Sequence, residues 1–170
     1  MPELMARMAE IAVSRHEADV LVALGLGSCI GVALLDRASL VAGLAHVVLP
    51  ESRPGATTPG KFADTAVPEL LCRVIGLGAT RGRLHAVLVG GAQMFAVSAG
   101  GALDIGRRNE QAVRTALAVA GIPITTTLTG GGAGRTMRVH IGSGIVTCKQ
   151  AGSQEETIAT RDARRLRAAA

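Results

Sequence analysis

The sequence has almost no aromatic side chains: its 170 residues include two Phe, no Tyr and no Trp. Bases therefore cannot stack on aromatic side chains, and no dense Lys/Arg run is present, so we expect no nucleic-acid partner. The core must be aliphatic, since hydrophobic residues make up 48% of the chain and charged residues 18%. This balance excludes a disordered chain, and the length suits one domain with one substantial core. The net charge of +5 favours acidic partners.

Cysteine is also scarce, with three residues in the chain: Cys29, Cys72 and Cys148. The number is odd and no CxxC pair occurs, so a disulfide framework is not expected. Glu3 and Glu10 interrupt the N-terminal region, which lacks the apolar segment of a secretory signal. We therefore expect free thiols in the cytoplasm. The cysteines and the four histidines show no metal-ligand spacing, so the sequence predicts neither a metal site nor a cofactor.

Residues 86–103 form an uncharged run that is long enough for a membrane helix to be considered. Two Gly-Gly pairs interrupt this run, and Gln93 and Ser98 lie between them. We interpret it as a strand, a loop and a following structured piece. No membrane insertion is predicted.

Apolar runs separated by Gly and Pro indicate more strands than helices. The expected strands are 11–13, 19–26, 29–35, 43–49, 84–89, 124–129, 136–141 and 145–149, and the expected helices are 62–75 and 106–120. The apolar run of 19–26 is continuous, which indicates a strand buried on both faces. In the helix 106–120, polar residues that include Asn109 oppose an apolar stripe. Short turns join most neighbouring strands, so we expect an α/β fold with largely antiparallel or mixed sheets covered by two main helices.

The segments outside these elements have their own composition. Residues 1–10 are expected to be a loose lead-in, and the Pro/Gly/Thr-rich loop 51–60 either closes over a site or serves as a connector. A single domain over residues 1–150 precedes a polar Arg/Ala-rich tail, 151–170, which is expected to be a surface helix or frayed.

The most informative stretch runs from residue 24 to residue 50 and reads as strand, glycine-rich corner, cysteine, strand, turn and strand. Residues 36–39 would form the turn, and Pro50 would stop the returning strand. If the turn is symmetric about Arg37 and Ala38, Cys29 lies directly opposite His46. Opposed residues share a face, with Cβ atoms about 4.5–5.5 Å apart.

A thiol beside an imidazole is a nucleophile beside a base, because the thiolate is the reactive form and a neighbouring imidazolium lowers the thiol pKa so that the thiolate exists at neutral pH. Gly25, Gly27 and Ser28 precede the cysteine, and their N–H groups would serve as an oxyanion hole. The alternatives remain that Cys29 is a small buried hydrophobe and that His46 is structural.

Other glycine patterns do not match known phosphate-binding motifs. Residues 130–136 lack the spacing G-x-x-x-x-G-K-[ST], and Gly25-x-Gly27 is followed by Ile30 where a dinucleotide fingerprint has glycine. Tight turns account for both, and the chain contains no G-x-S-x-G elbow.

Several blocks, spread in order over most of the chain, together resemble the CheD family of chemoreceptor glutamine deamidases. They are LGLGSCIGVALLD, GLAHVVLP, KFADTAVPELL, GGAQMF, IGRRN and GGGAGRT. The resemblance implies an α/β/α sandwich that converts receptor glutamines to glutamates, with Cys29 as nucleophile and His46 as general base. The implied partners are the cytoplasmic helices of methyl-accepting chemotaxis receptors and a CheC-type phosphatase.

One position departs from the resemblance. Family members commonly carry a catalytic Thr six residues before the cysteine, where this chain has Ala23. A non-catalytic adaptor that binds receptors or a CheC-type phosphatase is therefore an alternative, and hydrolysis of receptor glutamyl methyl esters is another. Ammonia in the product distinguishes deamidation from both.

Overall fold

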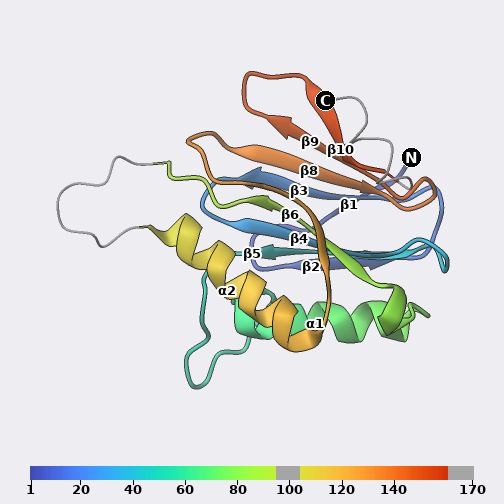
Figure 1. Cartoon of the computed structure of the whole chain (residues 1–170), viewed down its shortest axis with the longest axis horizontal. Helices are drawn as coiled ribbons and strands as arrows, with labels where there is room; N and C mark the ends of the chain where they lie inside the picture. Colours follow the sequence, from blue (N-terminus) through green and yellow to red (C-terminus); the bar gives the residue numbers. More distant parts are fainter. Residues whose placement is uncertain (95–103, 161–170) are drawn as a thin grey trace.

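The computed structural model describes residues 1–94 and 104–160 and contains two five-stranded sheets (Figure 1). The first sheet has the order β1 (Glu3–Met5), β3 (Val20–Leu26), β8 (Arg135–His140), β9 (Ile145–Gln150) and β10 (Glu155–Ala159). The second has the order β2 (Ile11–Ser14), β5 (Val41–Val47), β4 (Ile30–Asp36), β6 (His85–Gly90) and β7 (Ile124–Thr129). Two pairs, β1–β3 and β6–β7, are parallel and the other pairs are antiparallel, so the prediction of mixed sheets is confirmed.

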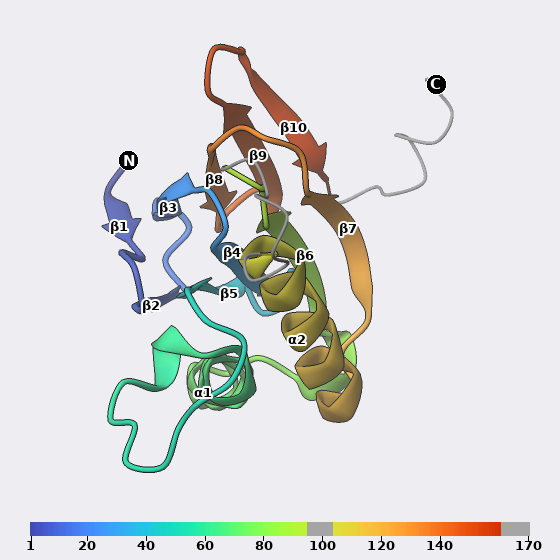
Figure 2. The same cartoon turned by 90° about the vertical axis from the view of Figure 1, so that its left-hand side faces the viewer.

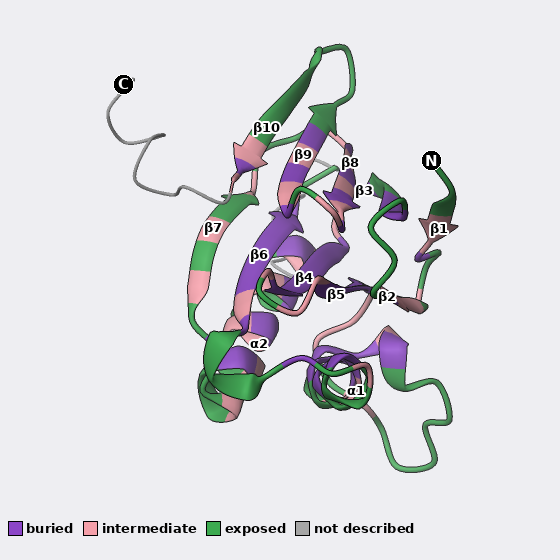
Figure 3. Cartoon of the chain, turned by 90° about the vertical axis from the view of Figure 1, so that its right-hand side faces the viewer, coloured by how far each residue is buried: buried purple, intermediate pink, exposed green. Residues whose placement is uncertain are grey.

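The hairpin of β4 and β5 is the centre of the molecule, because every residue of both strands is buried. Alternate residues point to opposite faces. Ile30, Val32 and Leu34 pack on the helix side, whereas Ala33 and Leu35 pack between the sheets. Figure 3 shows β4 and β5 buried along their length and β6 buried beyond its first residue, whereas the edge strand β10 is largely exposed and β7 alternates between exposed and intermediate residues.

Both helices, α1 (Ala63–Gly76) and α2 (Ile105–Ala120), lie side by side against the second sheet (Figures 1 and 2). The α/β class with two covering helices is confirmed. The layers run helices, sheet, sheet, rather than helix, sheet, helix as the resemblance implied. Pro68 lies inside α1 without ending it, and α2 ends at Gly121, which adopts the left-handed conformation.

Three expectations differ from the structure. Strand β1 lies within the segment expected to be a loose lead-in, and it pairs with β3. Strand β3 was expected to be buried on both faces, but Leu24 is 50% exposed. Strand β10 occupies part of the tail expected to be helical or frayed, because its backbone pairs with β9.

Two further expectations concern segments that the structure does not describe. The structured piece predicted after residue 94 and the end of the tail, 161–170, lie outside the described residues. Neither helix in the described part of the chain has the length and apolarity that a membrane crossing requires.

Candidate functional site: a buried thiol and imidazole between the sheets

The β4–β5 register places Gly31, not Cys29, directly opposite His46. The predicted direct opposition is therefore wrong by two residues. Asp36 pairs with Val41, so the turn is centred one residue later than expected. The cause is local: the Asp36 carboxylate accepts hydrogen bonds from the N–H groups of Ala38 (3.1 Å) and Ser39 (3.4 Å) and holds them in the turn.

A two-residue shift keeps every side chain on its original face, because the period of a strand is two. Cys29 and His46 therefore lie on the same face of the sheet as diagonal neighbours, an arrangement in which residues are roughly 7–8 Å apart. Gly31 contributes no side chain beside His46. A Cβ there would lie 2.8 Å from Leu26 Cδ1 and 3.1 Å from Met137 Sδ, so a larger residue would have to push these two side chains aside.

His46 is 1% exposed, and its main chain and ring both bind the N-terminal segment. Its Nδ1 lies 3.2 Å from Ala6 O. A carbonyl only accepts, so Nδ1 carries the proton and Nε2 is the basic nitrogen. Nε2 is buried and has no hydrogen-bond partner among the described residues. The backbone of His46 also accepts from Ala9 N and donates to Glu10 O, each at 3.0 Å.

The segment expected to be a loose lead-in thus orients the imidazole. Sequence reasoning missed this contribution. Its only signal would have been a three-residue strand, which is too short to show a period.

The loop before Cys29 is held by the segment that follows β6. Gly91 N donates to Cys29 O at 2.9 Å, and Ala92 N donates to Gly27 O at 2.7 Å. Gly90 has a φ of +119°, and a Cβ on it would lie 2.2 Å from Cys29 O. The close approach of these two chains therefore depends on glycine.

Asn109 on α2 is a second residue that the sequence reasoning did not assign to the site. Its side chain is buried, and Nδ2 donates to Ser28 O (3.0 Å) and to Val48 O (2.9 Å). The sequence placed this residue among the polar residues of the predicted helix 106–120, a pattern that gives no sign of its burial.

The glycine-rich segment 130–136 supports the loop after β6. Gly130 N donates to Gly90 O at 2.9 Å, and Gln93 N donates to Gly131 O at 2.8 Å. The buried Arg135 donates through Nη1 to the carbonyls of Gly90 (3.3 Å) and Gly130 (2.7 Å). These contacts agree with the interpretation of this segment as a turn.

Burial shifts the two titrating groups in opposite directions. It raises the pKa of the Cys29 thiol above its usual 9.0, although the residue's own backbone N–H partly opposes the shift. It lowers the pKa of His46 below its usual 6.5, although the bond to Ala6 partly opposes that shift. Both shifts favour a neutral thiol and a neutral imidazole, not the thiolate and imidazolium expected from the sequence, because burial disfavours both charged forms. Such a pair reacts by proton transfer to the imidazole as the sulfur attacks.

Ala23 also faces the space between the sheets, is fully buried and pairs with Met137 of β8. A methyl group at this position supplies no hydroxyl to His46 or to a water. Within the described ranges, no three His, Cys, Asp or Glu side chains gather as metal ligands.

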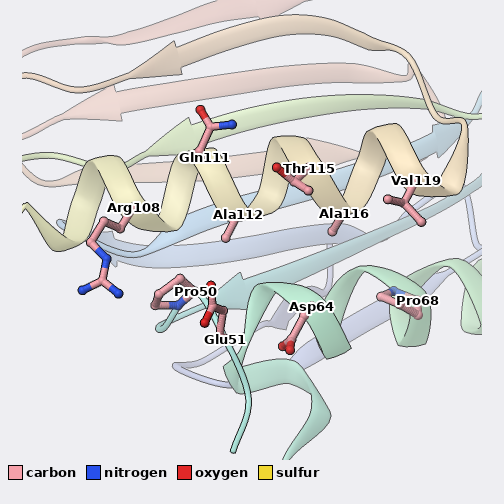
Figure 4. Close-up of a pocket in the computed structure, with 10 residues that line it drawn as sticks. All are labelled: Pro50, Glu51, Asp64, Pro68, Arg108, Gln111, Ala112, Thr115, Ala116 and Val119. Atoms are coloured by element: carbon pink, nitrogen blue, oxygen red, sulfur yellow. The ribbon is translucent and has the colours of Figure 1, made fainter.

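A separate groove of about 520 Å³ lies between α1 and α2 (Figure 4). Its lining is largely apolar and includes Pro50, Pro68 and Ala112, with Arg108 and Asp64 beside them. Cys29 and His46 do not line it. Two residues that line the groove are close in sequence to residues of the site. Pro50 is two residues after Val48, and Arg108 directly precedes Asn109.

Comparison with known proteins gives the family. The model of the family described as CheD chemotactic sensory transduction matches residues 48–150, more than half of the chain. The chain belongs to the CheD family. A CheD relative from Methanococcus vannielii is 40% identical over 148 residues, which cover 86% of this chain and 94% of the relative. One from Desulforamulus reducens is 44% identical over 141 residues, covering 81% and 85%.

Both CheD relatives carry the name "Probable chemoreceptor glutamine deamidase CheD". The family-model match begins after Cys29 and His46, so the roles of those residues rest on the geometry described above. Among solved structures, Neisseria meningitidis protein NMB0706 is 12% identical with a TM-score of 0.42 over 75% of this chain and 62% of that chain. A likeness this weak carries no argument.

Proposed function

We propose that this chain hydrolyses glutamine side chains of chemoreceptors to glutamate and ammonia, with Cys29 as nucleophile and His46 as base. The observation that carries the proposal is the orientation of His46. Its Nδ1 is fixed by Ala6 O, while Nε2 is buried without a partner in the described residues, on the face that also holds Cys29. The names of the CheD relatives supply the substrate class.

The reaction begins from the neutral pair. His46 Nε2 takes the proton of the Cys29 thiol as sulfur attacks the carboxamide carbon of the glutamine, which forms a tetrahedral intermediate. The C–N bond then breaks, and His46 returns the proton to the departing nitrogen, which leaves as ammonia. Water, deprotonated by His46, hydrolyses the thioester to glutamate and restores the thiol.

The negative oxygen of the intermediate requires backbone donors near the nucleophile. Gly27 N donates to Gly25 O at 2.9 Å, so its hydrogen is already engaged. The N–H groups of Ser28 and Cys29 donate to no backbone carbonyl in the part of the chain that the structure describes. These two groups are the donors we assign to the oxyanion, with Gly27 giving the loop its shape.

We assign this activity to a single domain over residues 1–150, acting in the cytoplasm on the cytoplasmic helices of the receptors. The net charge of +5 favours helices rich in glutamate. A CheC-type phosphatase is a further proposed partner. Residues 151–170 form a C-terminal extension, of which β10 pairs with β9.

The test is ammonia release from purified receptor cytoplasmic fragments, with mass spectrometry to follow the gain of about 1 Da per converted glutamine. Cys29→Ala should lower the rate by several orders of magnitude, since it removes the nucleophile. Cys72→Ala is the matched control, because Cys72 is an exposed thiol on α1 and should be dispensable.

Full activity in Cys29→Ala would exclude the mechanism. Methanol in place of ammonia would identify a methylesterase. Receptor binding without any product, in the wild type as well as in Cys29→Ala, would identify the adaptor that Ala23 left as an alternative.

A further inference from the structure

We propose that Asn109 is a positioning residue for the reaction: it fixes the Ser28–Cys29 peptide and ties it to the strand that carries His46. The inference rests on the proposed function, since it assigns a role in the same site. It is carried by the contacts of one buried amide and by the geometry of a trans peptide.

The Asn109 side chain is fully buried, and its Nδ2 serves two carbonyl oxygens, Ser28 O at 3.0 Å and Val48 O at 2.9 Å. Carbonyl oxygens only accept, so this end of the amide must be the NH₂ group. Its Oδ1 is buried without a partner among the described residues. The amide is therefore held by its two donor bonds alone. Its unsatisfied acceptor is retained beside residues 27–29, which we call the nucleophile loop.

The bond to Ser28 O orients the next N–H group. No peptide bond in the described chain is cis, and in a trans peptide the C=O and the N–H point in opposite directions. Because Ser28 O points toward Asn109 on α2, the Cys29 N–H points away from α2, toward the space between the sheets. That space contains the thiol, and the same N–H favours the thiolate by lowering the pKa of Cys29.

The bond to Val48 O ties the nucleophile loop to the His46 strand where their ladder ends. The last pair between β4 and β5 is Ile30 with Val47, so Ser28 and Val48 lie beyond it. One amide bridges the two chains at this point. Asn109 thus sets both the direction of the Cys29 N–H and the spacing between the two strands.

The test is Asn109→Asp, which keeps the shape of the side chain and replaces the donor group by a second acceptor. We expect kcat for ammonia release to fall on the order of 100-fold with little change in KM, because a small displacement near the reacting atoms has that effect. A buried carboxyl facing two carbonyls has a raised pKa, and its protonated form donates again. The ratio of variant to wild-type kcat should therefore rise as the pH falls.

Gln111→Glu is the matched control, since it makes the same chemical change on the exposed side of α2 and should leave kcat and its pH dependence unchanged. A folded Asn109→Asp variant with wild-type kcat would overturn the inference, as would a lowered kcat that shows no recovery at low pH. If Asn109→Asp does not fold, Asn109→Ala carries the same expectation for kcat without the pH-dependent recovery.

A second readout separates this inference from the proposed function. The rate at which iodoacetamide alkylates Cys29, relative to the exposed Cys72, should fall in Asn109→Asp, because the thiolate loses an aligned donor and gains a nearby negative charge. A wild type that releases no ammonia contradicts the proposed function. Equal relative alkylation in wild type and variant contradicts the role of Asn109.

Discussion

Gly90→Ala should displace the backbone at Cys29 without removing the Cys29 thiol or the His46 imidazole. Gly90 ends β6 with a φ of +119°, and a Cβ there would lie 2.2 Å from Cys29 O. The carbonyl is backbone, so it cannot rotate away. It would have to move by roughly 0.8 Å to reach the 3.0 Å that real Cβ atoms keep, and a shift of that order costs about 100-fold in rate.

The effect on stability has two parts. An L residue with positive φ is strained by about 1–2 kcal/mol, and overpacking a tight site adds about 1–3 kcal/mol. The structure offers a control that contains only the first part. Gly78 has a φ of +105° and nothing within 4 Å of its Cβ position, so Gly78→Ala is strained but meets no atom.

The assay is thermal unfolding of both variants, together with their ammonia release. Gly90→Ala should unfold at a lower temperature than Gly78→Ala, by roughly 2–4 °C for each kcal/mol of the contact in a chain of this size. Only Gly90→Ala should lose activity. Equal melting temperatures and equal activities in the two variants would refute the argument that Gly90 is required by its contact with Cys29.

Two further predictions concern buried ionisable groups. The Asp36 carboxylate is buried, but hydrogen bonds from Arg83 at 2.9 and 3.0 Å help hold its pKa well below the usual range. Asp36→Asn should destabilise the fold by about 2–4 kcal/mol in urea unfolding, whereas Glu17→Gln at an exposed site should have little effect; equal losses would contradict this. Burial lowers the pKa of His46, so its contribution to stability is complete above pH 6.5 and is lost as the pH falls further. As the pH is lowered from 7 to 5, the free energy of unfolding should fall less steeply for His46→Gln than for wild type. The exposed His16→Gln is the control, and an equal flattening of the pH dependence in that variant would contradict the assignment to His46.

The sequence predicts the central strands and both helices because each is a clear apolar run or stripe ended by glycine or proline. The short edge strands β1 and β10 escape this reasoning. Three to five residues with polar neighbours show no period, and their pairing depends on a sheet assembled by other parts of the chain.

The sequence predicts the shared face of Cys29 and His46 but not the strand register or the burial of Asn109. The face shared by Cys29 and His46 follows from the period of two, which a shift of two residues preserves. The register itself depends on how Asp36 holds its turn, and this carboxylate is in turn bound by Arg83 and Thr80, which lie far along the chain. The burial of Asn109 likewise depends on where α2 packs, which a helical pattern alone does not state.

The contact between Ala6 O and His46 Nδ1 has a consequence for how the orientation of this imidazole can be altered by mutation. The orienting atom belongs to the main chain, so the bond needs no particular side-chain chemistry at position 6, but Ala6 is fully buried between the sheets and its site admits a small residue. A small residue at position 6 therefore leaves the carbonyl in place, whereas a bulky one, or deletion or displacement of the first strand, moves it. The requirement acts on the length and path of the N-terminal segment and on the size of residue 6, not on the chemistry of its side chain.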